Sequence, residues 1–369
     1  PLSKAGASFE KTVENLGGNP ENPFAIFNDV TDFYQRVLDE KRDFVKKFRE
    51  QQDEWKSDNP DKAALLGEFL SGNAPSVDLS TLDQKQDIAT RNASSAVLSM
   101  LADTVGNMIV SSADLSNSDK TDGFLKKTTS FRKNDFSGAF LQSGVAELTM
   151  AAIANGLALH GGIIPVVATF FVFSDFMKPA VRLAALMKLP VKYIWTHDAF
   201  RVGEDGPTHQ PVEQEAQIRL LEKLKNHDGK MSLLALRPAD AVETTIAWEM
   251  ALNNTQAPTA LILSRQNIKD LPAEGGMSRY EAAMGAKNGA YIVRNADNPD
   301  VVLVANGSEV ATLVEAADIL SNEDGLKIQI VSAISEGLFR TQSAAYQAEV
   351  IPNNVPVFGL TAGLPDNLV

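Results

Sequence analysis

Short runs of valine, isoleucine and leucine alternate with longer amphipathic segments through most of the chain beyond residue 83. The short runs have the length and β-branched content of buried strands, and the longer segments have the apolar spacing of helices. We predict strands at residues 107–115, 163–173, 191–195, 231–238 and 259–266, and helices at residues 86–105, 144–162, 179–188, 212–225 and 240–254. This alternation is typical of a parallel sheet that is covered by helices on both faces.

The same alternation resumes after a break at residues 271–276 (LPAEGG), with strand-like runs at residues 290–295, 301–307, 327–334 and 355–363. Residues 1–83 differ, because they mix Gly, Asn and Pro with isolated aromatic residues and contain two charged, surface-type helices, at residues 40–57 and 62–72. We therefore predict an α/β protein with two consecutive doubly wound, mostly parallel-sheet domains, at residues 84–268 and 269–369. A linker segment with surface helices, at residues 1–83, precedes them.

Composition narrows the possible functions. The 369 residues include 47 acidic and 34 basic side chains, and the net charge of −13 argues against a general nucleic-acid binder. Any anionic ligand must therefore be met by locally placed Arg or His. The absence of cysteine excludes disulfides, thiol nucleophiles and thiolate metal sites. No apolar run approaches the ~20 residues that span a bilayer, and no signal peptide opens the chain, so we expect a cytoplasmic protein without a membrane partner.

The stretch from residue 169 to residue 210 concentrates the candidate chemistry. Phe170, Phe173 and Phe176 recur at every third position, which is more often core packing than a stacking site. The predicted strand at 191–195 then leads to His197 and to a loop, GEDGPTHQP, whose glycines and prolines exclude regular structure. Open α/β sheets bind ligands beyond the carboxyl ends of their strands, which is where this loop lies.

Other polar residues stand at similar positions. Arg265 follows the strand-like TALILS, and Arg91 lies in a helix among small residues; either can grip a phosphate or carboxylate or form a surface ion pair. Asp114 ends the strand NMIVSSAD, where it can orient a ligand or cap a turn, and Ser118 can add a hydroxyl donor or serve the turn alone.

Glu147 begins a helix that is otherwise almost wholly apolar, and we expect that helix to be buried. A carboxyl group at a helix N-terminus usually serves the helix dipole. A buried and unpaired one can share a proton with a nitrogen base, which is a catalytic property. His197 and His209 could bind a metal with Asp198 and Asp205, but no metal-binding spacing supports this, and we predict no metal ligands in this chain.

Taken together, these segments resemble the transketolase family. GVAELTMAAIANGLALHGG, TFFVFSDF, THDAFRVGEDGPTHQP, RPAD and LILSRQN are similar, in order and spacing, to the family's pyrimidine-binding middle domain. The region after them resembles the third domain, and residues 1–83 resemble the segment that crosses from the first domain to the second. The resemblance implies a cytoplasmic, dimeric, thiamine diphosphate-dependent transferase of the pentose phosphate pathway. Such an enzyme moves a two-carbon ketol unit from a ketose phosphate to an aldose phosphate.

The resemblance also implies roles for single residues. Glu147 matches the catalytic glutamate that hydrogen-bonds the N1′ atom of the thiamine diphosphate aminopyrimidine and thereby activates the cofactor. Phe170, Phe173 and Phe176 match the aromatic wall around the pyrimidine, with Phe173 as the stacking ring. Asp114 matches an acid near the cofactor.

The remaining matches concern the binding of the sugar phosphate. The sugar-phosphate grip corresponds to Arg91, Ser118, His197 and Arg265. Asp205 matches the group that contacts the C2 hydroxyl of the donor, and His209 matches a histidine close to the substrate and the reaction centre. Glu147, His197 and His209 are therefore the expected catalytic set.

Several departures from the family pattern qualify these expectations. Ala146 stands where the family commonly has Arg, Arg201 stands where a small residue is usual, and Phe176 often corresponds to Tyr. The Gly-Asp-Gly motif that binds the diphosphate and its divalent metal in the family's first domain is absent from this sequence. We therefore expect Mg or Ca to bind on a domain that this chain lacks, and a C-terminal domain that is incomplete. In the family the cofactor lies between the first domain of one subunit and the middle domain of the other. This chain should thus work as a homodimer, or paired with a chain that carries the diphosphate-binding domain, and should be inactive alone.

Two alternatives remain open from the sequence. One is a related thiamine diphosphate enzyme, such as dihydroxyacetone synthase or deoxyxylulose phosphate synthase. The other is a non-catalytic dimerisation or regulatory subunit of the same fold, which Ala146 and the missing diphosphate motif favour.

Overall fold

The computed structural model describes residues 2–365 and divides into two compact units, residues 1–67 and 68–369. The first unit contains α1 (Phe9–Asn15), α2 (Asn28–Asp58) and most of α3 (Pro60–Leu70). No residue of α2 is buried, which agrees with the surface helix predicted at 40–57, although the helix is longer than predicted. Its aromatic side chains, among them the stacked Phe44 and Phe48, are exposed to solvent.

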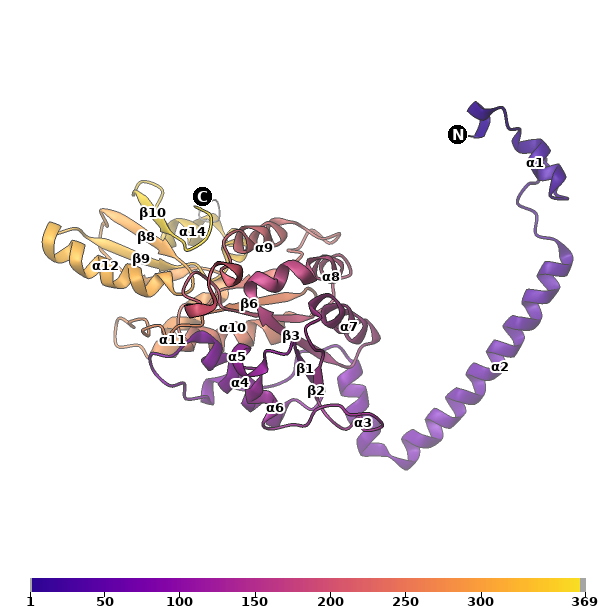
Figure 1. The fold of residues 1–369 in the computed structure, drawn as a ribbon, viewed down its shortest axis with the longest axis horizontal. Coiled ribbons are helices and arrows are strands. Elements are labelled where there is room, and N and C mark those ends of the chain that lie inside the picture. The colour runs from indigo at the N-terminus through magenta and orange to yellow at the C-terminus, as the bar shows by residue number, and fades with distance from the viewer. Residues whose placement is uncertain (1, 366–369) are drawn as a thin grey trace. The chain divides into compact units, whose positions relative to one another are not determined.

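A parallel sheet forms the centre of the first α/β region of the second unit (Figure 1). Its strands are all parallel, and their spatial order is β2 (Phe140–Gln142), β1 (Met108–Ser112), β3 (Ile164–Phe170), β4 (Lys192–Thr196), β6 (Thr259–Leu263) and β5 (Leu234–Leu236). The helices around it are α4 (Thr90–Thr104), α5 (Ser116–Asp119), α6 (Asp122–Leu125), α7 (Glu147–His160), α8 (Ser174–Leu186), α9 (Gln214–Lys223) and α10 (Ala241–Asn253). The strand and helix predictions between residues 86 and 266 are therefore confirmed, whereas β2, α5 and α6 lie in a segment without a clear apolar period.

Alternate side chains of each strand enter two separate cores, as the period of two requires. On one face, Val167 and Trp195 pack with α7, α8 and α9, and on the other, Val166 and Ile194 pack with α4 and α10. The core of the second face continues from α10 into the next sheet, where it includes Leu303. Both faces of the first sheet are thus covered, which explains why its strands are almost continuously apolar.

The second sheet has the order β10 (Val357–Leu360), β8 (Val301–Ala305), β9 (Ile328–Ser332) and β7 (Tyr291–Arg294), with β7 antiparallel to β9. It is accompanied by α11 (Arg279–Ala283), α12 (Glu309–Asp324), α13 (Glu336–Phe339) and α14 (Ala344–Val350). The predicted fold class, two successive α/β regions with mostly parallel sheets, is confirmed. The exact domain boundaries stay a prediction.

The expectation that the apolar helix after Ala146 is buried holds for only one side of it. Met150, Ala151 and Ala154 of α7 are buried, but Leu148 and Leu159 are exposed. Periodicity could not separate these faces, because the helix is apolar all round.

Candidate functional site

The carboxyl ends of β1, β3, β4 and β6 carry most of the predicted site residues, as expected for an open parallel sheet. Polar or aromatic residues follow each of these strands. The backbone there is unusual: Asp114 after β1 has a φ of 62° and His197 after β4 a φ of 60°, which is the left-handed region. Side chains with a Cβ seldom adopt this conformation, and such residues gather at functional sites.

Glu147 is the first residue of α7 and is only 7% exposed. Its Oε1 atom accepts a hydrogen bond of 3.3 Å from the Oγ1 atom of Thr169, the residue that precedes Phe170 in β3. Ala146, at the N-cap, supplies no side-chain bond to the helix. The carboxyl group therefore lies out of water, beside the strand that leads into the aromatic row.

The three phenylalanines form a continuous row as the chain leaves β3 and enters α8. The rings of Phe170 and Phe173 stack at 5.9 Å with an interplanar angle of 11°, and Phe173 lies 6.1 Å from Phe176. Phe170 is buried, whereas Phe176 is 61% exposed. Phe171, between them, points instead into the core against Trp195. The row is therefore partly open to solvent, which suits a stacking surface better than a closed core.

Two histidines border this row. The His197 ring lies 3.7 Å from the Phe170 ring centre, and the His209 ring lies 5.2 Å from that of Phe173 in an edge-on arrangement. The loop that carries His209 contains two short 3-10 turns, η4 (Gly203–Asp205) and η5 (Pro207–His209). The side chains predicted from the loop thus reach the aromatic residues predicted from the strand.

His197 is 2% exposed, and its Nδ1 atom lies 3.0 Å from the Oγ1 atom of Thr196. Burial lowers the pKa of His197 to about 3, with further contributions from the charges of Arg91, Arg265 and His209. The imidazole is therefore neutral at physiological pH and offers a directional hydrogen bond rather than a charge.

Arg91 and Arg265 are brought together by bonds between the start of α4 and the end of β6. The Thr90 N–H donates to the Ser264 Oγ atom at 3.0 Å, and the Ser264 N–H donates to the Thr90 Oγ1 atom at 2.7 Å. Burial and the nearby charge of Arg265 lower the pKa of Arg91. Because the fold keeps these two positive charges near each other, an anion that binds between them relieves their repulsion.

The contacts of the Arg91 and Arg265 guanidinium groups are consistent with an anion-binding site. Arg91 Nη1 donates to the backbone carbonyl of Ser118 at 2.7 Å, while its buried Nε has no hydrogen-bond partner among the described residues. The Arg265 guanidinium lies against Gly203, where an added Cβ would be 2.9 Å from Nη2. Ser118 therefore contacts Arg91 through its carbonyl oxygen, and the role expected of its hydroxyl group stays a prediction.

The two predicted acids lie at the exposed rim. Asp205 is exposed, and its charge acts on Arg91. Asp114 is exposed and makes no hydrogen bond or ion pair within residues 2–365. Arg201 is also exposed, with its guanidinium carbon 5.7 Å from the centre of the Phe200 ring.

Sequence reasoning missed the residues that hold this site in place. Asp119 is buried and accepts bonds from Ser112 at 2.6 Å and from the Thr121 hydroxyl at 2.7 Å, which shapes the turn between Asp114 and Ser118. Burial raises the pKa of Asp119. Nothing in the sequence marks Asp119 as the acceptor of these bonds, because Ser and Thr residues are common in turns.

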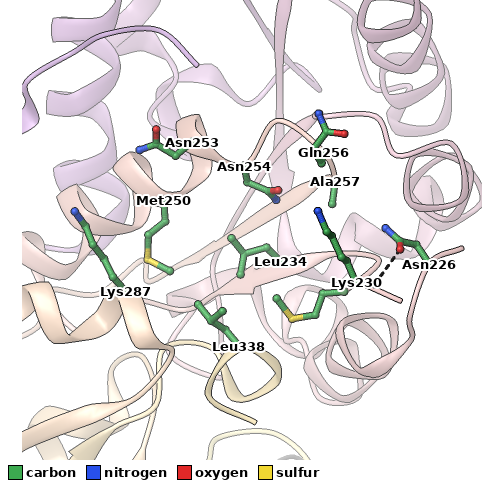
Figure 2. Close-up of a pocket in the computed structure, with 11 residues that line it drawn as sticks. Asn226, Lys230, Leu234, Met250, Asn253, Asn254, Gln256, Ala257, Lys287 and Leu338 are labelled. Atoms are coloured by element: carbon green, nitrogen blue, oxygen red, sulfur yellow. Dashed lines mark hydrogen bonds between the residues drawn. The ribbon is translucent and has the colours of Figure 1, made fainter. Parts of the chain in front are cut away.

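A pocket of about 430 Å³ lies elsewhere, at the amino ends of β5 and β6 (Figure 2). Leu234 and Ala257 line it together with Met250, Lys287 and Leu338. The residues predicted for the site, all within the described part of the chain, are not among its lining. The carboxyl-end site is therefore separate from this cavity.

Known proteins share both α/β regions. The family model of the transketolase pyrimidine-binding domain matches residues 86–270, about half of the chain, and the model of the transketolase-like C-terminal domain matches residues 289–368. The chain belongs to the transketolase family. A transketolase of Halalkalibacterium halodurans is 40% identical over 339 residues, which are 91% of this chain and 48% of that protein. The chain spans about half the length of the curated relatives it matches.

Solved structures agree with this assignment. The transketolase from Leishmania mexicana superposes with a TM-score of 0.85 and 35% identity, over 95% of this chain and 50% of that one. A split-gene transketolase, described as an inactive β4 tetramer, matches with a TM-score of 0.53 and 25% identity, over 74% of this chain and 88% of its own. A transketolase-family chain of comparable extent therefore exists as a separate polypeptide.

Within residues 2–365, no helix is long and apolar enough to cross a bilayer. The same residues contain no group of three or more His, Asp or Glu side chains that could hold a metal ion.

Proposed function

We propose that this chain provides the pyrimidine-binding half and the sugar-phosphate grip of a transketolase. The complete enzyme would transfer a two-carbon ketol unit from a ketose phosphate to an aldose phosphate. The observation that carries the proposal is the buried Glu147 carboxyl group next to the strand that leads into the partly open row of three phenylalanines, with the arginine pair at the ends of neighbouring elements. The family membership supports the same reaction class.

The residues present fit the pyrimidine half of thiamine diphosphate. A flat heterocycle needs an aromatic surface that solvent can reach, and Phe173 and Phe176 supply one. A basic ring nitrogen needs a carboxyl group without a strong partner, and the described bond of Glu147 is a long one to Thr169. When bound, the cofactor supplies the carbon nucleophile that takes up the ketol unit.

In this proposal Glu147 holds a proton between its carboxyl group and the ring nitrogen, and Phe173 orients the ring by stacking. His209, edge-on to Phe173 at 5.2 Å, would face the reacting end of the sugar. Asp205 orients the donor hydroxyl at C2, and Asp114 lies near the cofactor. These roles stay predictions.

The opposite end of the substrate meets the charged part of the site. Arg91 and Arg265 supply positive charge to the phosphate, and neutral His197 donates or accepts a single hydrogen bond beside them. Ser118 completes the grip. The grip fixes the distance between phosphate and reacting carbon, which favours sugar phosphates over free sugars.

The diphosphate and its Mg or Ca ion would be held by a domain that lies outside this chain. The split-gene relative supports pairing with another polypeptide, and a homodimer of a longer protein is the other arrangement. Domain boundaries at residues 83/84 and 268/269, a cytoplasmic location and a role in the pentose phosphate pathway belong to the same proposal.

The test is reconstitution with a diphosphate-binding domain from a related transketolase. Xylulose 5-phosphate and ribose 5-phosphate should then yield sedoheptulose 7-phosphate. Glu147→Gln should lower turnover by about 10²–10⁴-fold, because it removes the proton that the carboxyl group supplies. Glu315→Gln, at an exposed ion pair with Lys269, is the matched control and should have no effect.

Near-normal turnover by Glu147→Gln would contradict the catalytic assignment. A reconstituted assembly that binds its partner domain but turns over no ketose phosphate would favour the non-catalytic subunit instead. Turnover that requires a different acceptor would favour a related thiamine diphosphate enzyme.

A further inference from the structure

His197 occupies a strained corner between two fixed points of the chain. Before it, Thr196 pairs with Phe170 and Leu263 in the first sheet. After it, Asp198 is buried, and His197 itself has the left-handed φ of 60°. A residue with a Cβ keeps this conformation only where its neighbours fix the backbone on both sides. The anchor of Asp198 therefore decides how the His197 ring is held.

Arg237 is that anchor. Its Nε and Nη2 atoms both donate to the Asp198 Oδ2 atom, at 3.1 Å and 2.8 Å. Both side chains are almost fully buried, with 1% exposure each. Arg237 follows β5, so the bond joins the ends of two strands that are not neighbours in the sheet.

The second α/β region holds Arg237 in turn. Arg237 Nη1 donates to the Asn306 Oδ1 atom at 2.6 Å and pairs with the Glu309 Oε2 atom at 2.6 Å, and Gly307 N–H donates to the Arg237 carbonyl at 3.0 Å. Gly307 also leaves the space that the guanidinium fills, because a Cβ there would lie 2.7 Å from Nε. These contacts come from the turn between β8 and α12.

The charges around Arg237 make this contact persistent. Burial acts to lower the pKa of Arg237, but the carboxylates of Glu309, Glu215 and Asp198 outweigh it and raise the pKa. The guanidinium stays charged, and a buried ion pair is costly to open because each charge would be left without a partner.

We propose that Arg237 is a positioning residue for the sugar-phosphate grip, through which the turn after β8 fixes Asp198 and thereby the orientation of His197. This inference rests on the proposed role of His197 in phosphate binding. It gives the C-terminal region a part in substrate recognition, although Asn306 and Glu309 follow a strand of the second sheet and every residue of the grip lies in the first α/β region.

Imidazole ¹⁵N NMR of the full chain tests this, because the sequence has only four histidines and His197→Gln identifies its signal. Arg237→Gln and Asn306→Ala should shift the His197 signal without ligand. Each should also weaken binding of xylulose 5-phosphate, measured by titration of that signal, by about tenfold. Asn306→Ala leaves Arg237 and Asp198 in place and removes only the bonds of Asn306 to Arg237 and Glu215, so it decides the question if Arg237→Gln fails to fold.

Arg279→Gln is the matched control. Arg279 also joins the two regions, through Asp240 at 2.6 Å, Glu243 and the Tyr291 hydroxyl group, but none of these residues borders His197. It should leave the His197 signal and the affinity unchanged. An unchanged His197 signal in folded Arg237→Gln or Asn306→Ala would overturn the inference. If the His197 signal of the wild type does not shift when xylulose 5-phosphate is added, the phosphate grip is refuted instead. The ligand-free spectra of the variants would still decide whether Arg237 positions His197.

Discussion

Replacing His197 with glutamine should make the stability of the chain less sensitive to acid. Burial and the charges of Arg91, Arg265 and His209 lower the pKa of His197 to about 3 in the folded chain, from an ordinary value of 6.5. Between these two values the unfolded chain binds a proton that the folded chain does not bind. The free energy of unfolding therefore falls as the pH falls through this range.

The size of the effect follows from the two pKa values. The loss approaches about 1.4 kcal/mol for each pH unit below 6.5, which gives about 2 kcal/mol between pH 7 and pH 5. His197→Gln removes this contribution and leaves the other acid-sensitive groups in place. The decrease in unfolding free energy between pH 7 and pH 5 should therefore be about 2 kcal/mol smaller in the variant than in the wild type.

Urea unfolding at pH 7, 6 and 5, followed by tryptophan fluorescence, measures this difference. Trp195 and Trp248 are fully buried on opposite faces of the first sheet and report on its unfolding. His227→Gln is the control, because His227 is exposed, and it should behave like the wild type. Parallel pH dependences for the wild type and His197→Gln would refute the burial and charge effects assigned to this corner.

Three further substitutions test the anion grip. Arg265→Ala should weaken binding of xylulose 5-phosphate by about 10–150-fold, with little effect on free xylulose, in calorimetric titrations of the reconstituted enzyme. The exposed Arg182→Ala should change neither, and equal losses for both sugars would contradict the grip. Gly203→Ala should strain the backbone at a φ of 79° and thereby lower the free energy of unfolding by about 1–2 kcal/mol. The added methyl group should also displace the Arg265 guanidinium and so raise KM for phosphorylated donors. Thr90→Val should leave the Ser264 N–H without its acceptor and should lower the free energy of unfolding, measured in urea, by about 1–3 kcal/mol. An unchanged free energy of unfolding would contradict the contribution of that hydrogen bond.

The sequence predicted the sheets well because burial on both faces leaves a simple signal. The runs that became β3, β4 and β6 are mostly apolar and entirely or almost entirely buried, as is typical of strands in a covered parallel sheet. The signal fails where burial is partial or the element is short. β2 has three residues in a polar segment, and α7 is apolar on its exposed side as well as on its buried side.

The candidate site could be predicted only for residues that stand at strand ends or in a recognisable motif. Phe173, His197 and His209 are such residues, and the structure places all three rings around Phe170. The residues that hold these side chains in place become their neighbours only in the tertiary structure. Asp198 and Arg237 are 39 residues apart and pair only because β4 and β5 both flank β6. No local pattern marks such a pair.

Within the proposed phosphate grip, a buried and neutral histidine has a physical advantage over a charged one. Arg91 and Arg265 already supply the positive charge, and a third charge near these half-buried groups would add repulsion. A neutral imidazole adds a bond of defined direction without that repulsion. Its direction is useful only if the ring is fixed, and the left-handed corner between Thr196 and Asp198 fixes it. In this proposal the buried Arg237–Asp198 pair holds the strained backbone at His197, so that the orientation of the grip depends on residues that never touch the phosphate.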